Sequence, residues 1–253
     1  AITIKSEREI ELMAEAGKIL ERVHNELEKA LRPGMSTKDI DTLGEEIIRS
    51  YGCIPSFLNY NGYPASICVS VNQEVVHGIP DKHRIIQEGD IVSLDAGVIY
   101  KGYHSDAART HAVGKVSEEA KKLIQVTKES FFEGIKFAKA GNHLFDISGA
   151  IGRYAEERGY GVVRDLCGHG IGTALHEAPE IPNYEVGRKG VRLRPGMTLA
   201  IEPMINIGTH EVDWLDDDWT VVTRDGSLSA HYENTILITE GEPRILSLTC
   251  ENE

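Results

Sequence analysis

The chain is poor in cysteine and aromatic residues and has no long apolar run. Its 253 residues include 4 cysteines, and no two stand at C-x-x-C spacing, which excludes the zinc and redox sites built on that motif. A chain of this length can bury a core without disulfide staples, so we expect reduced thiols at Cys53, Cys68, Cys167 and Cys250. The beginning, AITIKSEREIE, lacks the apolar stretch of a signal peptide, and no segment reaches membrane-spanning length. We therefore expect a cytoplasmic protein without a membrane partner.

Basic residues are also scarce relative to acidic ones. The sequence holds 27 Lys and Arg against 40 Asp and Glu, for a formal net charge of -13, which argues against nucleic acid binding. A local basic patch at 121–122 or 188–194 stays open, although most such runs are solvated faces. Hydrophobic content of 41% with 26% charged residues is typical of a globular protein that buries a real core.

Two segments of the chain repeat each other, with a constant offset of 107 in residue number. Each copy closes with a glycine followed six residues later by an acid, Asp95 in the first copy and Glu202 in the second. The matched positions are Gly34 with Gly141, Asp39-Ile40 with Asp146-Ile147, Gly52 with Gly159, and Gly89 with Gly196. With no linker between the copies, this repeat predicts a single catalytic domain, 1–253, made of similar halves at approximately 1–115 and 116–253. Two equivalent acids that face each other in a closed site need a cation.

Hydrophobic periodicity predicts two pairs of helices and several strand hairpins. The capping box at Ser6 and Glu9 begins a helix to about residue 31, and Ser36 or Thr37 caps a second helix that Gly52 ends. The same plan recurs over 117–140 and from about 143 to 159. Predicted strands cover 65–71, 91–100, 103–113, 161–166, 197–208, 219–223 and 228–239. Paired helices with antiparallel hairpins indicate the α+β class rather than a doubly wound sheet.

The predicted hairpin at Asp95 brings two acids to one face. With a two-residue turn at 101–102, Asp95 lies opposite Ala108. Gly97 then lies opposite Asp106, and the two carboxylates point the same way at a diagonal backbone distance of about 7–8 Å, which a metal ion can bridge. A lone Asp near a turn is more often a solvated surface residue. That alternative is weaker here because Asp95 interrupts an apolar strand, where an unpaired carboxylate is costly.

Three further residues complete a candidate metal site. His169 stands in a glycine-flanked segment that we expect to be a loop after a strand, Glu202 ends an apolar strand, and Glu233 precedes another. Each alone has an ordinary structural reading, as a hydrogen-bonded histidine or a surface acid. With Asp95 and Asp106 they form four carboxylates and one imidazole, a set that suits Mn²⁺, Fe²⁺, Co²⁺ or Zn²⁺. This composition is typical of hydrolytic centres with two metal ions about 3.5–4 Å apart.

Several longer motifs are those of one enzyme family. They are NYNGYPASICVSVN at 59–72, VHGIP at 76–80, SLDAG at 93–97, HSDAART at 104–110, GHGIG at 168–172, LHEAP at 175–179, IEPM at 201–204 and DWTVVTRDGSLSAHYENT at 218–235. On these motifs the chain closely resembles the type I methionine aminopeptidases over nearly its whole length. The resemblance implies the pita-bread (creatinase/aminopeptidase) fold, an antiparallel sheet core covered by helix pairs with internal pseudo-twofold symmetry. Because the chain has neither an N-terminal zinc-binding extension nor the helical insertion of type II enzymes, it resembles the short bacterial form.

The resemblance also implies a reaction, the removal of an N-terminal methionine from nascent proteins and peptides whose second residue is small. The implied ligands of two divalent ions (Co, Mn, Fe or Zn) are Asp95, Asp106, His169, Glu202 and Glu233, with a water between the ions as the nucleophile. Glu202 is implied as the proton shuttle. His77 is implied to face the scissile amide and His176 the developing oxyanion. From the sequence alone, a loop histidine bonded to backbone would be the commoner reading of both.

A methionine side chain needs an apolar pocket of aromatic and sulfur character. The resemblance implies this set of substrate-binding residues: Phe57, Tyr60, Tyr63, Cys68, His77, His176 and Trp219. Core packing is the alternative for Phe57 and Trp219, and Leu175, where several relatives have Phe, indicates a wider rim. A monovalent cation (Na or K) is implied near Asn72, Glu74 and Ser229. We further expect a monomer that contacts the ribosome only transiently.

Two alternatives stand beside this interpretation. Prolidase-like and aminopeptidase P-like enzymes use the same five ligand types, but they usually carry a large N-terminal domain and lack the loop at 59–64. A non-catalytic pita-bread protein that only binds partners should have lost metal ligands, and this chain retains all five. Both alternatives are therefore less well supported than the methionine aminopeptidase interpretation.

Overall fold

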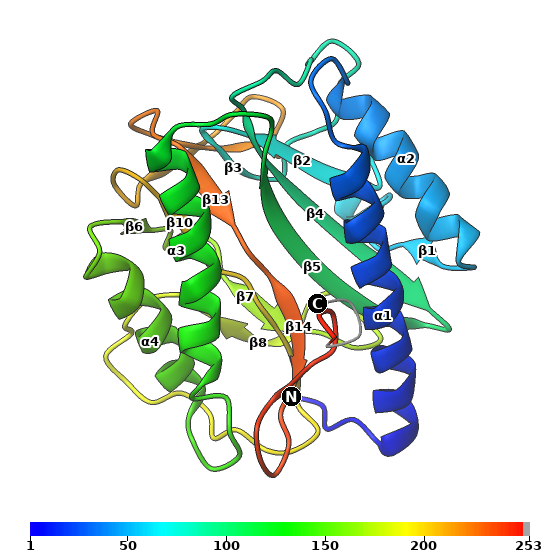
Figure 1. The fold of residues 1–253 in the computed structure, drawn as a ribbon. Helices are drawn as coiled ribbons and strands as arrows, with labels where there is room; N and C mark the ends of the chain where they lie inside the picture. Colours follow the sequence, from blue (N-terminus) through cyan, green and yellow to red (C-terminus); the bar gives the residue numbers. More distant parts are fainter. Residues whose placement is uncertain (250–253) are drawn as a thin grey trace.

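Two pairs of helices, one from each half of the chain, lie over the strands in the computed structural model, which describes residues 1–249 (Figure 1). The first pair is α1 (Glu7–Ala30) and α2 (Thr37–Ser50), and the second is α3 (Glu118–Ile135) and α4 (Leu144–Glu156). The capping box at Ser6 is formed as the sequence predicts, and Ser36, one of the two predicted caps of the second helix, forms a capping box as well. Each serine accepts a hydrogen bond from the backbone three residues on. Among the described residues, no helix combines the length and apolar composition needed to cross a bilayer.

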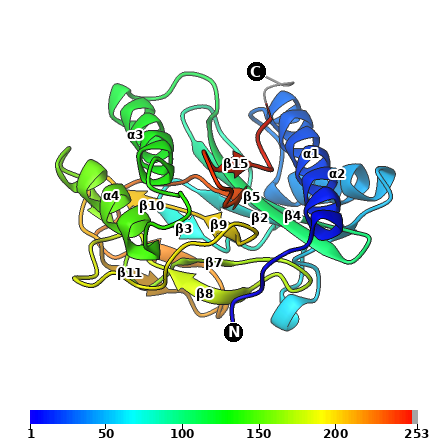
Figure 2. The same cartoon turned by 90° about the horizontal axis from the view of Figure 1, so that it is seen from below.

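The strands form four small antiparallel sheets. The sheets are β1-β4-β2 with β5 on β4, β13-β10-β6, β11-β12-β3, and β15-β14-β9-β7-β8. In the first half the strands are β1 (Ile54–Pro55), β2 (Ile67–Val71), β3 (Glu74–Val76), β4 (Ile91–Tyr100) and β5 (Tyr103–Ala112). In the second half they are β6 (Gly161–Val162), β7 (Gly168–Gly170), β8 (Glu177–Ile181), β9 (Thr198–Ile201), β10 (Met204–Asn206), β11 (Val212–Trp214), β12 (Val221–Thr223), β13 (Ser229–His231), β14 (Asn234–Leu237) and β15 (Arg244–Ile245). Seen from below, β7 and β8 lie on the side away from the helices (Figure 2).

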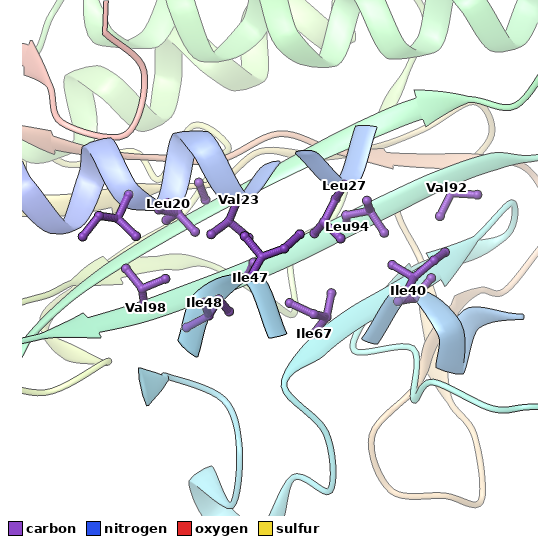
Figure 3. Packing of buried hydrophobic residues seen from close by; sticks show 14 of the residues in the cluster. Leu20, Val23, Leu27, Ile40, Ile47, Ile48, Ile67, Val92, Leu94 and Val98 are labelled. Atoms are coloured by element: carbon purple, nitrogen blue, oxygen red, sulfur yellow. The ribbon is translucent and has the colours of Figure 1, made fainter. Parts of the chain in front are cut away.

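Each half has its own apolar core beneath its helix pair. The first core is built from residues between 16 and 113, and Figure 3 shows Leu20, Val23 and Leu27 along α1, with Leu27 beside Leu94 of β4. The buried members of the second core lie between 131 and 238 and include Phe131 of α3, and Ile2 and Ile245 pack against them. A third cluster takes residues from both halves and lies where they meet. Burial of these apolar faces is what fixes each helix pair on its strands.

The backbone confirms the internal repeat. Ile54 pairs with Ile99 between β1 and β4, and Gly161 pairs with Asn206 between β6 and β10, so both partners are shifted by the offset found in the sequence. The isolated bridges of Ser36 with Ile85 and of His143 with Arg192 repeat at the same offset. The paired glycines share their left-handed backbone: φ is 95° at Gly34 and 94° at Gly141, 76° at Gly52 and 89° at Gly159, and 94° at both Gly89 and Gly196. The register found in the sequence therefore corresponds to a repeated chain path.

Two long strands predicted in the second half are each broken in two. The segment predicted at 197–208 forms β9 and β10, which belong to different sheets, with Glu202 and Pro203 between them. Proline has no backbone N–H to donate to a ladder, which accounts for the break. The segment predicted at 228–239 divides into β13 and β14 at Tyr232 and Glu233. Strand β6 is also shorter than predicted, β12 begins only at Val221, and α3 ends at Ile135 instead of residue 140.

Candidate active site

The hairpin of β4 and β5 presents Asp95 and Asp106 to one face, as the sequence predicts. The observed register places Gly97 opposite Asp106. Positions 101 and 102 both have positive φ, 47° and 87°, as a tight turn that follows the twist of the strands requires. The side chain of Thr235, from the second half, accepts from the backbone N–H of Asp106 and donates to its carbonyl, at 2.9 and 2.8 Å. Both carboxylates are buried, at 8% and 3% relative exposure.

Glu202 and Glu233 lie at the two breaks of the second half. Glu202 follows β9 directly, and Glu233 lies between β13 and β14. The backbone of Glu233 exchanges two hydrogen bonds of 3.0 and 3.1 Å with Ala108 of β5, and the Arg109 guanidinium donates to its carbonyl. Because these contacts join β5 of the first half to the second half, they bring the acids of both halves to one point. The strand breaks thus position two of the predicted ligands.

His169 is the centre of strand β7 and not part of a loop, so that part of the prediction is wrong. The flanking glycines allow β7 to pass close to its neighbours: a Cβ on Gly168 would lie 2.3 Å from the Ala200 carbonyl oxygen, and one on Gly170 would lie 2.1 Å from that of Ala178. Nδ1 of His169 donates to the Gly170 carbonyl at 2.9 Å. This bond leaves Nε2 to face the acids.

The five predicted ligands lie together. Asp106, His169, Glu202 and Glu233 each offer one ligand atom within 4.8 Å of the others. Nε2 of His169 lies 3.2 Å from Glu202, 3.4 Å from Asp106 and 3.8 Å from Glu233. Asp95 joins Glu233 in a second group of the same dimensions. Several of these buried atoms have no hydrogen-bond partner, namely Asp95 Oδ1, Asp106 Oδ1, His169 Nε2 and both carboxylate oxygens of Glu233.

Burial and crowding perturb the ionisation of this cluster. Burial, followed by the charge of Asp106, raises the pKa of Asp95 well above its usual range. Burial and the charges of Asp106 and Glu202 likewise raise the pKa of Glu233. For His169, burial lowers the pKa, but contact with Asp106 and Glu202 outweighs it and raises the pKa to about 10. In the metal-free protein, protons therefore supply the positive charge that divalent ions would supply, and the donor set fits such ions.

A cavity of about 220 Å³ opens directly onto these acids. Its walls include all seven predicted substrate-binding residues together with Asp95, Asp106 and Glu202. Tyr63 and Trp219 meet edge to face, with ring centroids 5.1 Å apart, and Phe57 and Cys68 are buried. Leu175 also lines the cavity, as does Asn61, which the sequence reasoning did not identify. The arrangement places an apolar and aromatic pocket beside a group of metal-type ligands.

Two histidines border both the pocket and the acid cluster. His176 shares a hydrogen bond of 2.9 Å between its Nδ1 and the Tyr60 hydroxyl, and its ring centroid lies 4.1 Å from that of His169. Burial, with the neighbouring charge of His169, lowers the pKa of His176 to about 4. His77 has a positive φ of 60° and faces Trp219 at a ring distance of 6.4 Å. Burial lowers its pKa as well, so both rings are neutral at neutral pH.

His231 was missed by the sequence reasoning and lies at the same cluster. Its side chain is 1% exposed, and its Nε2 lies 3.2 Å from Oε1 of Glu202. It belongs with Asp95 and Glu233 to the second candidate metal group. A comparison at one constant offset could not find it, because the second half carries additional residues before β13, which changes the offset.

The residues predicted for a monovalent cation are neighbours. The Asn72 carbonyl accepts a hydrogen bond of 3.0 Å from the Ser229 N–H, and Glu74 accepts one of 2.8 Å from the Val71 N–H. Asn72 has a left-handed backbone with φ of 58°. A cation at this position stays a prediction.

Cys53, Cys68 and Cys167 are free thiols, whereas Cys250 lies outside the described residues.

Known proteins resemble this chain over nearly its whole length. Residues 11–240 match the model of metallopeptidase family M24. The methionine aminopeptidase of Clostridium acetobutylicum is 58% identical over 250 residues, which is 99% of this chain and 100% of that protein. The crystal structure of methionine aminopeptidase from Thermotoga maritima is 47% identical, with a TM-score of 0.96, over 98% of this chain and 100% of that one.

A more distant structure separates the shared fold from the particular branch. The Xaa-Pro dipeptidase of Bacillus anthracis is 27% identical, with a TM-score of 0.77, and the match covers 97% of this chain but 62% of that protein. The fold is therefore common to both kinds of peptidase, whereas full-length correspondence and high identity occur with the methionine aminopeptidases. The chain belongs to metallopeptidase family M24, has the pita-bread fold, and falls among its methionine aminopeptidases.

Proposed function

We propose that this chain removes the N-terminal methionine from nascent proteins and peptides whose second residue is small, with residues 1–253 acting as one catalytic domain. The observation that carries the proposal is that a single cavity is lined both by aromatic and apolar side chains and by Asp95, Asp106 and Glu202. A methionine side chain in the apolar part would leave its own carbonyl beside the acids. Proximity of this kind accounts for a large part of the catalysis of hydrolysis.

Five residues would hold two divalent ions, which we expect to be Co, Mn, Fe or Zn. The residues that would hold them are Asp95, Asp106, His169, Glu202 and Glu233. The support is the buried cluster of carboxylates and imidazole whose ligand atoms lie within 4.8 Å of one another and largely lack hydrogen-bond partners. When bound, the ions supply the Lewis acidity that makes water a nucleophile at neutral pH.

Three side chains have roles beyond holding metal. The Glu202 carboxylate would accept a proton from the attacking water and pass it to the leaving amine. His176, which is neutral, would donate from Nε2 to the oxyanion when the Tyr60 hydroxyl donates to Nδ1, since that bond selects the ring tautomer. His77, which also lines the cavity, would contact the scissile amide.

The methionine pocket explains selectivity for the first residue, and the histidines limit the second. Phe57, Tyr60, Tyr63, Cys68 and Trp219 supply aromatic faces and a sulfur atom against which a thioether packs favourably. Beyond the scissile bond, the close approach of His176 to His169 leaves little room for a bulky side chain. A small second residue therefore avoids displacing the ring that stabilises the oxyanion.

The proposal also includes a monovalent cation, a cellular location and an oligomeric state. We propose one Na⁺ or K⁺ at Asn72, Glu74 and Ser229, supported by the Asn72–Ser229 backbone contact. We also propose a cytoplasmic monomer that meets nascent chains with transient ribosome contact. The full-length identity to methionine aminopeptidases supports the same class of substrate.

Peptide hydrolysis by the metal-reconstituted protein tests the function. We expect kcat/KM for Met-Ala-Ser to exceed that for Met-Leu-Ser by at least about 10²-fold, which corresponds to roughly 2.7 kcal/mol of transition-state binding. An Ala-Pro peptide serves as the control for prolidase-like and aminopeptidase P-like activity. Preferential cleavage of the Ala-Pro peptide would reject the proposal in favour of those enzymes. Tight metal binding without any hydrolysis would instead indicate a non-catalytic protein.

A further inference from the structure

His231 occupies the position in the second half that Asp106 occupies in the first. Gly97 pairs with Asp106 between β4 and β5. Met204, the equivalent of Gly97 at the repeat offset, pairs with His231 between β10 and β13. The pseudo-twofold relation thus relates a predicted metal ligand of the first half to a histidine of the second.

The environment of His231 resembles that of His169. Its side chain is buried, and its Nε2 lies 3.2 Å from Glu202 but makes no hydrogen bond. Nε2 of His169 is also buried, close to acids and without a hydrogen-bond partner. A buried ring nitrogen without a partner is costly, and it calls for an occupant of the space that it faces.

The backbone of His231 is fixed, so its ring has a defined direction. The Thr110 hydroxyl of β5 accepts from the His231 N–H and donates to its carbonyl, both at 2.9 Å. β13 accordingly lies beside β5 (Figure 1). Ligand atoms of His231, Asp95 and Glu233 lie within 4.8 Å of one another, as the atoms around a metal ion do.

We propose that Nε2 of His231 is a ligand of the metal ion held by Asp95 and Glu233, in addition to the five ligands of the proposed function, on which this inference rests. Four carboxylates balance the charge of two divalent ions, so a neutral imidazole adds a ligand without adding charge. A nitrogen ligand favours Co²⁺, Fe²⁺ or Zn²⁺ at this position over ions that prefer only oxygen. The centre then has one imidazole for each ion, His169 on one side and His231 on the other.

Metal titration of the metal-free protein tests the proposal without relying on activity. Calorimetric titration with Co²⁺ should resolve two ions in the unchanged protein. In His231→Ala we expect the dissociation constant of the weaker ion to rise at least about 10-fold, while that of the tighter ion changes little. The Co²⁺ absorption spectrum acquired with the second equivalent should change as well, because a nitrogen ligand is lost. Unchanged affinities and spectra for both ions would overturn the proposal.

Two further variants separate a ligand from a residue that only orients Glu202. His231→Gln retains an amide donor that can reach Glu202, so full recovery of second-ion binding in this variant would overturn the ligand role. We expect second-ion binding to stay weak. His111→Ala is the matched control, since this histidine lies on β5 but contacts Glu28, 3.1 Å away, and should leave both affinities unchanged. Should the unchanged protein bind fewer than two ions, the two-metal function itself would fail, which is a different outcome from loss of the His231 effect alone.

Discussion

The two halves of the molecule share a chain path but differ in the chemistry they carry. Strands β1 and β6 correspond at the repeat offset, as do β4 and the β9–β10 pair. Strands β2 and β7 correspond at a shorter offset of 99. In the first half Ser70 of β2 pairs with Ser93 of β4. Ala200 is equivalent to Ser93 at the repeat offset and pairs with His169 of β7, so His169 is the equivalent of Ser70. The first half therefore has eight more residues between its first two strands. Those residues belong to the loop that carries Phe57, Tyr60 and Tyr63.

This difference assigns separate tasks to equivalent segments. In the first half, the connection after β1 forms most of the aromatic wall of the cavity. In the second half, the shorter connection after β6 leads directly to His169. The second half has its own additional residues, and these include the β11–β12 hairpin beside Trp219. The shared chain path thus accounts for the scaffold, while unequal insertions place most of the aromatic lining of the cavity in one half and His169 in the other.

The largest expected effect comes from making the halves more alike at one position. The strand registers place Glu233 opposite Glu202 in the second half. The equivalent pair in the first half is Ala108 opposite Asp95. Glu233→Ala gives both halves alanine there and removes a predicted metal ligand. We expect kcat/KM to fall at least about 10³-fold, because proton transfer and nucleophile formation both depend on the centre.

Metal content and folding distinguish that loss from simple unfolding. The far-ultraviolet circular dichroism of Glu233→Ala should match that of the unchanged protein, while metal analysis finds less than two ions per chain. Asp106→Ala is the corresponding change in the first half and should behave similarly. Near-normal turnover by either variant with its metal content reduced would contradict the two-metal interpretation.

The second prediction concerns His176. This residue, in the motif HEAP, corresponds to His77, in the motif HGIP, at the same shorter offset that relates β7 to β2. His176→Ala should lower kcat by about 10²-fold with a modest change in KM, since a bond to the oxyanion exists only in the transition state. Steady-state kinetics on a Met-Ala peptide measures both constants. Tyr60→Phe removes the hydroxyl that contacts Nδ1 of His176 and should show a smaller loss of kcat. A change confined to KM would assign His176 to substrate binding alone.

The repeat and the hairpin register could be predicted because both follow from local chemistry. Glycine at positive φ and a two-residue turn leave few alternatives for the chain path. The strand breaks and the place of His169 within β7 could not be predicted, because they depend on neighbours distant in sequence, such as Ala200 and Ala178. His231 was missed for a different reason. The difference in residue number between Asp106 and its counterpart His231 is larger than the repeat offset. A comparison at one constant offset therefore misses His231, whereas a comparison that allows insertions would find it.

The third prediction concerns metal removal and its dependence on pH. In the metal-free protein the pKa values of Asp95, Glu233 and His169 are raised, so between pH 5 and 8 these three groups hold more protons in the folded state than in the unfolded state. The stability that these three groups contribute to the metal-free protein should therefore fall as pH rises through this range. The lowered pKa values of His77 and His176 act in the opposite direction below about pH 6.5, but they do so equally with and without metal. Glu202, whose pKa is lowered by His169 and His231 despite burial, opposes this slope only at more acidic pH.

Calorimetric melting with and without chelator measures this effect. Chelation should lower Tm more at pH 8 than at pH 5, by several degrees, because protons occupy the ligand groups more fully, and so replace the ions better, at the lower pH. Asp106→Asn removes one negative charge from the cluster and should reduce the difference between the two pH values. An equal loss of Tm at both pH values would show that metal binding does not stabilise the protein by neutralising the charge of these acids.

The smallest expected effect tests the scaffold that the halves share. Gly34 and Gly141 have φ of 95° and 94°, and a Cβ at either would meet no atom within 4 Å. Alanine at either site should therefore cost only the strain of a left-handed backbone, about 1 kcal/mol, with no contribution from steric overlap. Urea unfolding should give nearly the same loss for Gly34→Ala and Gly141→Ala, and the double variant should lose their sum, since the two sites share no contacts. Because neither residue lies at the cavity, kcat/KM should not change. A clearly larger loss at one site would mean that the repeated path is not equally strained in the two halves, and that their symmetry is limited to the strands around the centre.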